Sequence, residues 1–93
     1  MPVTVISTST TTQIKNGSGY LSSIEIAAAG TSWTLQIKDG PDVNGNFKTI
    51  LGASALTVPA VGTNLIPAPV FFSNGLQFVT AGATPGELDV AWT

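Results

Sequence analysis

Apolar and polar side chains alternate along much of this chain with a period of two residues. Trp33, Leu35 and Ile37 share one side of a stretch whose intervening positions are polar. Such alternation is typical of a β-strand with one buried and one exposed face. The pattern predicts strands at 19–28, 31–39, 75–81 and 87–93. Shorter runs predict further strands at 3–8, 11–15, 47–51, 55–58, 62–66 and 70–72.

The segment at 19–28 also alternates between two faces. Strict alternation places Tyr20 on the same face as Ile24 and Ile26, with Leu21 and Glu25 on the opposite face. The run at 24–29 is the one candidate for a helix, but it is short and ends at a glycine. We therefore interpret the whole segment as a strand.

Clusters of Gly, Pro, Asn and Asp separate these runs at short and fairly even intervals, for example at 16–19, 39–46 and 84–86. Short strands with regular turn signals predict an all-β fold, a single antiparallel β-sandwich of roughly seven or eight short strands, jelly-roll-like. Residues 17–93 are expected to form this sandwich. Residues 1–16 are expected to form an extended polar arm or an edge strand.

Composition adds an expectation about assembly. The chain has 93 residues, too few for a large core, and it contains neither Cys nor His. Disulfides and a structural zinc site are therefore excluded as sources of stability. Charged residues make up only 9% of the chain, against about 25% in an average soluble domain. A small domain with an uncharged surface is expected to gain stability by associating with copies of itself or with a larger assembly.

The charges also limit the partners. Three lysines and no arginine cannot neutralise a run of phosphates, so no nucleic-acid partner is expected. A basic amphipathic helix for membrane attachment is missing too, and no run approaches the roughly 18 apolar residues of a membrane span. The N-terminal residues do not form a secretory signal. The protein is expected to be made and assembled in a cytoplasm.

Catalytic chemistry has few candidate groups. Nucleophilic catalysis by serine needs a base, and histidine is absent. Glu87 and Asp89 lie on one face of a predicted strand, opposite Leu88 and Val90, which makes theirs the solvent side. We therefore assign no catalytic residue, no metal ligand and no cofactor.

The loop at 39–46 resembles part of a calcium-binding loop, because Asp42, Asn44 and Asn46 alternate around a glycine. A complete EF-hand loop also needs flanking helices and a closing glutamate, and Leu51 stands at the closing position. We interpret the loop as a wide hairpin turn in which Asp and Asn side chains cap their own backbone. Weak metal binding at this turn is the alternative.

The aromatic residues divide into two groups. Trp33 and Trp92 are in phase with the apolar residues of their strands and are expected in the core, while Tyr20 is expected in the core or at its rim. Sugar stacking would instead need aromatic side chains that are out of phase with the core.

Three consecutive apolar residues, Val70, Phe71 and Phe72, break the alternation. Either this segment is buried on both sides, or it presents Phe71, or the pair Val70 and Phe72, to a partner. Exposed aromatic side chains of this kind favour an oligomer interface. All three residues are therefore candidates for that interface.

Three segments together resemble a known class of proteins. They are GSGYLSSI at 17–24, GTSWTLQIKDG at 30–40 and NGLQFVTAGATPGELDV at 74–90. The series resembles small structural proteins of tailed bacteriophages, of the capsid decoration (cement) or head-fibre type. The resemblance implies a non-enzymatic β-sandwich, commonly trimeric, that sits on the outer capsid at symmetry axes and clamps neighbouring coat subunits. It implies a place in the virion, with the major capsid protein as partner.

The N-terminal arm offers a way to attach to a capsid. A polar, extended segment at 3–12 would add a strand to the sheet edge of a coat protein, where main-chain hydrogen bonds supply affinity. The candidate capsid contacts are Val3, Val5, Ile6 and Thr8.

Two other functions suit an all-β chain of this kind. A carbohydrate-binding module or adhesin predicts an exposed strip of aromatic residues beside polar groups. A pilus-like or surface-layer subunit predicts open polymers rather than closed trimers. An enzyme ranks last.

Overall fold

The computed structural model describes residues 2–63 and 65–93, with the side chains of residues 53–55 left out of the description. The described residues form eight β-strands and no helix. The strands are β1 (Val3–Ile6), β2 (Thr11–Asn16), β3 (Gly19–Ala28), β4 (Thr34–Asp39), β5 (Lys48–Thr57), β6 (Val70–Phe72), β7 (Gly75–Ala81) and β8 (Glu87–Trp92).

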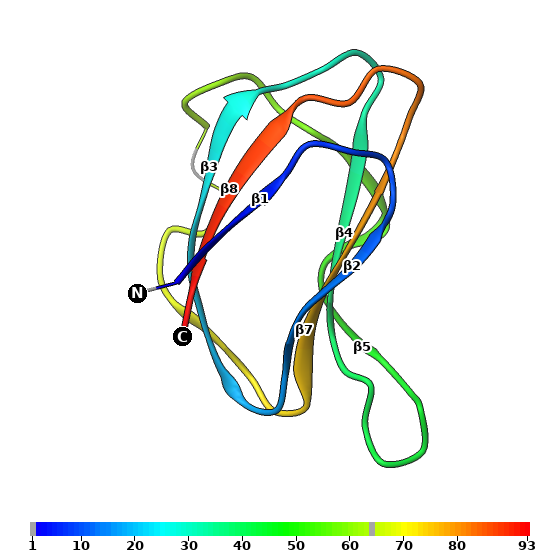
Figure 1. Cartoon of the computed structure of the whole chain (residues 1–93), viewed down its shortest axis with the longest axis vertical. Helices are drawn as coiled ribbons and strands as arrows, with labels where there is room; N and C mark the ends of the chain where they lie inside the picture. The colour runs from blue at the N-terminus through cyan, green and yellow to red at the C-terminus, as the bar shows by residue number, and fades with distance from the viewer. Residues whose placement is uncertain (1, 64) are drawn as a thin grey trace.

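The strands form two four-stranded sheets (Figure 1). Sheet A has the order β1-β8-β3-β6 and sheet B has the order β2-β7-β4-β5. Every neighbouring pair is antiparallel. The first strand pairs with the eighth, the second with the seventh, the third with the sixth and the fourth with the fifth. The expectation of an antiparallel, sandwich-like all-β architecture is confirmed. In the described residues, no helix is long and apolar enough to cross a membrane.

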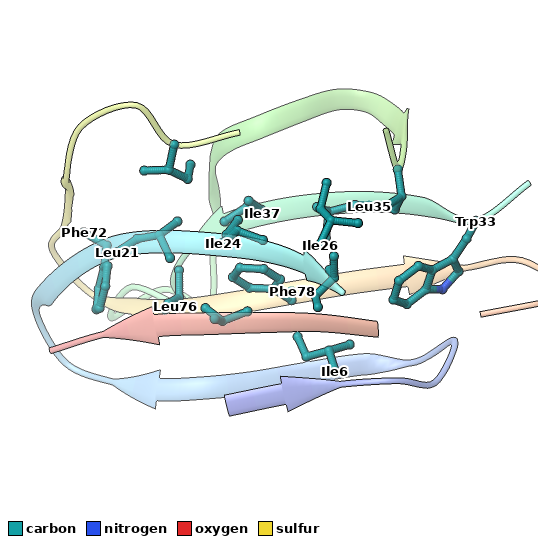
Figure 2. Close-up of a cluster of buried hydrophobic side chains, with 14 residues drawn as sticks. Ile6, Leu21, Ile24, Ile26, Trp33, Leu35, Ile37, Phe72, Leu76 and Phe78 are labelled. Carbon is teal, nitrogen blue, oxygen red and sulfur yellow. The ribbon is translucent and has the colours of Figure 1, made fainter. Parts of the chain in front are cut away.

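The core lies between the inner faces of the two sheets (Figure 2). Alternation supplies most of this core, because successive side chains of a strand point to opposite faces of its sheet and one of these faces is buried. The fully or nearly fully buried apolar residues are Ile6, Leu21, Ile24, Ile26, Trp33, Leu35, Ile37, Val58, Ile66, Phe72, Leu76, Phe78, Leu88 and Val90. Trp33 is confirmed as a core residue, and Trp92 packs against the core while remaining partly exposed.

The structure differs from the sequence-based expectation in three strands. The two runs at 47–51 and 55–58 belong to the single strand β5, which shifts register against β4. The strand expected at 62–66 is not found in the described residues of that stretch, and residue 64 lies outside the description. The strand expected from residue 31 begins at Thr34, because Ser32 has a positive φ of 51° that breaks the extended backbone.

The N-terminal residues are part of both sheets. β1 forms one edge of sheet A against β8, and β2 forms one edge of sheet B against β7. β1 and β2 are therefore edge strands of the two sheets, and residues 7–10 connect them. The reason is that Ile6 belongs to the core, where burial of its side chain favours docking over a detached segment.

Candidate interaction surface

Two aromatic residues lie exposed at one edge of sheet A. β3 and β6 place Tyr20 directly opposite Phe71. The two rings meet edge to face, with centroids 5.4 Å apart and planes inclined by 60°. Tyr20 is 50% exposed and Phe71 is 54% exposed. Exposed aromatic pairs are typical of surfaces that contact another molecule, because aromatic residues are enriched at protein interfaces.

The three residues of the 70–72 segment differ in burial. Phe72 is fully buried in the core and leaves the candidate interface. Val70 is half-buried and packs against the core, so it offers little surface to a partner. Phe71 points outward and is 54% exposed, which is one of the arrangements inferred from the sequence.

The sequence reasoning missed Tyr20 as the partner of Phe71. Strict alternation placed Tyr20 on the face of Ile24, but the register of β3 against β8 shifts between Leu21 and Ser23. One extra residue in a strand reverses the faces of everything before it. Leu21 therefore points into the core together with Ile24, and Tyr20 points outward. Two consecutive small polar residues at positions 22 and 23 are the only sequence signal of this bulge.

The opposite edge of sheet A exposes aliphatic side chains. Val3 is 61% exposed and Val5 is 57% exposed, while Ile6 turns into the core. Thr8 is exposed in the turn after β1, and its carbonyl accepts a hydrogen bond from Thr80 Oγ1 at 2.6 Å. Of the four candidate contact residues, Val3, Val5 and Thr8 are accessible to a partner, whereas Ile6 serves the core.

The outer face of sheet A carries carboxylates between these two edges. Glu25 on β3 lies directly opposite Asp89 on β8, and Glu87 lies opposite Ala28. Glu87 and Asp89 are on the side away from buried Leu88, as the alternation predicts. Like charges directly opposite on one sheet face are destabilising. This arrangement makes the middle of the face acidic.

The lysines lie on sheet B. The Lys15 ammonium lies 5.9 Å from the centroid of the Trp92 ring, and the Lys38 ammonium lies 5.9 Å from the centroid of the Phe47 ring. Lys48 is exposed at the start of β5. The acidic side chains of sheet A and the basic side chains of sheet B thus belong to different sheets.

The loop at 39–46 adopts the capped turn that its sequence predicts. Asp42 Oδ1 accepts hydrogen bonds from the backbone N–H groups of Asn44 at 2.8 Å and Asn46 at 2.9 Å. The Asp42 N–H in turn donates to the Asn46 carbonyl at 2.9 Å. The capping interpretation is confirmed. In the described part of the chain, no group of three or more potential metal ligands and no cavity is found.

Asp39 has a structural role that the sequence did not single out. Its side chain is buried and accepts backbone hydrogen bonds from Ser73 at 2.9 Å, Asn74 at 2.8 Å and Gly75 at 3.3 Å. Ser73 and Asn74 form the turn between β6 and β7, and Gly75 is the first residue of β7. The carboxylate therefore ties the end of β4 to the turn that follows Phe71 and Phe72. Nothing in the local sequence around Asp39 indicates this partner, which lies more than thirty residues away.

No protein-family model, no curated protein and no solved structure matches this chain.

Proposed function

We propose that this chain is a non-enzymatic structural protein that decorates and stabilises a bacteriophage capsid as an oligomer, a homotrimer by preference. The observation that carries the proposal is the exposed Tyr20–Phe71 pair at one edge of sheet A. Two half-exposed rings in mutual contact form a preassembled apolar patch, and covering it in an oligomer would remove both rings from water.

The strand order supports a jelly-roll fold for the domain. The nested pairing of first with eighth, second with seventh, third with sixth and fourth with fifth strands is the pairing of one long hairpin. Rolling such a hairpin brings β8 against β3 and β7 against β4, which are the two remaining contacts. Eight-stranded jelly rolls occur in viral capsid proteins and in lectins. This fold accordingly favours both the capsid proposal and its main alternative.

The hydrogen bonds and positions of the carboxylates support a structural role rather than a catalytic one. Both oxygens of Asp39 and one oxygen of Asp42 accept hydrogen bonds from backbone N–H groups, so these carboxylates hold turns. Glu25 and Asp89 stand on an open sheet face. Catalytic carboxylates are instead tuned by burial or by a specific charged partner within a cleft.

A carbohydrate-binding or adhesin module is the second candidate, because the exposed aromatic pair lies on a strand that also binds a hydroxyl group. The backbone N–H of Tyr20 donates to Thr93 Oγ1 at 3.3 Å. The 60° inclination between the rings of Tyr20 and Phe71 leaves no flat two-ring platform for a sugar chain. This geometry fits a protein contact better than an extended glycan.

The oligomer is tested by replacing the exposed ring. Phe71→Ser removes half of the aromatic patch and is expected to convert the oligomer into monomers, measured by light scattering. Phe47→Ser is the matched control, since Phe47 is also exposed, at 41%, but lies in the loop that joins β4 to β5 of sheet B. Equal loss of the oligomer in both variants, or in neither, would refute the assignment of the interface.

Decoration itself is tested on particles. A gold-labelled antibody against the purified protein is expected to mark the shells of intact virions in the source culture. Label confined to the surfaces of cells, together with glycan-array binding that Phe71→Ser abolishes, would replace the capsid proposal with the adhesin.

A further inference from the structure

Sheet edges expose unpaired backbone groups that bind other strands unless they are guarded. The four edge strands here differ in the guards that they carry. β2 has a register shift between Gln13 and Lys15 and a lysine within it, β5 shifts register against β4, and β6 has three residues and follows Pro67 and Pro69. β1 is short and follows Pro2, but it has neither a charge nor a bulge: its register with β8 runs without interruption from Val3 to Ile6.

The directions of the β1 backbone groups follow from its ladder. The Trp92 N–H donates to the Pro2 carbonyl at 3.1 Å, so Pro2 faces β8. Along an antiparallel strand, successive residues direct their N–H and C=O groups alternately to the two sides. Thr4 therefore faces β8 as Pro2 does, while Val3 and Val5 direct their backbone groups to the open edge. The same two residues carry the exposed side chains.

We propose that β1 pairs with β1 of a second copy of this chain, antiparallel about a two-fold axis at Thr4. This register sets Val3 opposite Val5 of the second copy, and Val5 opposite Val3. Both valines direct N–H and C=O groups outward, so the two pairs would form about four hydrogen bonds. The contact is isologous, with the same patch used by both copies.

A second copy is favoured over an unrelated strand because Val-Thr-Val is symmetric about its centre. The exposed side chains of Val3 and Val5 meet apolar partners of the same size on the same sheet face. The nearest carboxylate, on Asp89, stands one strand in from the edge, opposite Val5. Two such carboxylates would be separated by about three strand spacings, roughly 14 Å, which exceeds the screening length of about 8 Å at physiological ionic strength.

This contact goes beyond the proposed function and does not depend on it. β1 and β6 are opposite edges of sheet A, so a β1 contact leaves the Tyr20–Phe71 patch free for its own interface. If both are used, the β1 contact links one oligomer to the next across a two-fold axis.

Single cysteines test the register, because the natural chain contains none. Thr4→Cys would bring two sulfurs to the axis, where Cα atoms of a non-hydrogen-bonded pair lie about 4.5 Å apart, within disulfide range. Val3→Cys places its two sulfurs diagonally, too far apart for a disulfide. Under mild oxidation in dilute solution, Thr4→Cys is expected to form covalent dimers at least about tenfold faster than Val3→Cys. Equal rates would overturn the proposed register.

A charged side chain at the open edge of β1 is a second test of the contact. It changes an exposed position and leaves the inward-facing residues of β1 unchanged. Val5→Lys is expected to weaken the concentration-dependent self-association about tenfold or more, measured by sedimentation equilibrium. Ser23→Lys is the control, because it adds the same charge to an exposed position on β3, two strands away from β1. Performing both in the Phe71→Ser background isolates this contact from the aromatic one. Unchanged association in Val5→Lys would overturn the proposal.

Discussion

Two adjacent phenylalanines point to opposite sides of sheet A in this fold. Phe72 is fully buried between the sheets, and Phe71 is more than half exposed beside Tyr20. Their separation follows from strand geometry, because successive side chains point to opposite faces. One side chain therefore stabilises the monomer while its neighbour is available to a partner.

Substitutions at these two positions are expected to separate stability from association. Phe72→Ala removes a buried ring and should lower the free energy of unfolding by about 3–5 kcal/mol, a large share of the total for a small domain. Phe71→Ser should change the unfolding free energy of the monomer by less than about 1 kcal/mol, because its ring is mostly in water. Urea denaturation in dilute solution measures both. A larger loss in the Phe71 variant would mean that its ring belongs to the core.

Asp39 is the residue whose removal should most affect a turn. Asp39→Asn keeps the size of the side chain but replaces one acceptor oxygen with a donor that faces backbone N–H groups. The expected cost is about 1–3 kcal/mol of unfolding free energy. Asp42→Asn makes the same chemical change in an exposed turn and should cost less. Equal costs measured by urea denaturation would contradict a special role for the buried carboxylate.

At the scale of the elements, alternation predicts most strands but not their irregularities. Trp33, Leu35 and Ile37 face inward as their period of two predicts. The prediction fails at Tyr20, because a bulge reverses the phase without a strong sequence mark. It also fails for β5, where two short runs form one strand that shifts register against β4. The place of each strand in its sheet depends on long-range pairing, and the local pattern of apolar and polar positions does not determine that pairing.

The N-terminal strands give a direct test at this scale. A protein that begins at Gly17 lacks β1 and β2, and with them the buried side chain of Ile6 and one edge of each sheet. We expect this truncated protein to be unfolded at 25 °C, with a circular dichroism spectrum that lacks β-structure. Cooperative unfolding of the truncated protein would restore the picture of a detachable arm.

At the scale of the whole molecule, the residues of the candidate surface come together only through topology. Tyr20 and Phe71 are distant in sequence and adjacent because β3 pairs with β6. Val3 and Val5 lie at the other edge of the same sheet, with the carboxylates of Glu25 and Asp89 between them. The sequence indicated Phe71 because its segment breaks the alternation, and the two valines because they lie in an extended N-terminal segment. Their positions at two edges of one acidic sheet could be predicted only from the fold.

This arrangement predicts a protein that uses its edges rather than a pocket. The aromatic edge is the stronger candidate, because two rings together offer more apolar surface than two valines. Association through it should persist on dilution, whereas pairing through β1 should add mass only at higher concentration.

The central claim is that this small domain works as an oligomer held by the Tyr20–Phe71 edge. The most direct test is the solution mass of the purified protein by light scattering across a wide range of concentrations, compared with Phe71→Ser. The natural protein is expected to give three chains per particle at low concentration, and the variant is expected to give one. A natural protein that stays monomeric at every concentration would contradict the claim and favour the carbohydrate-binding alternative.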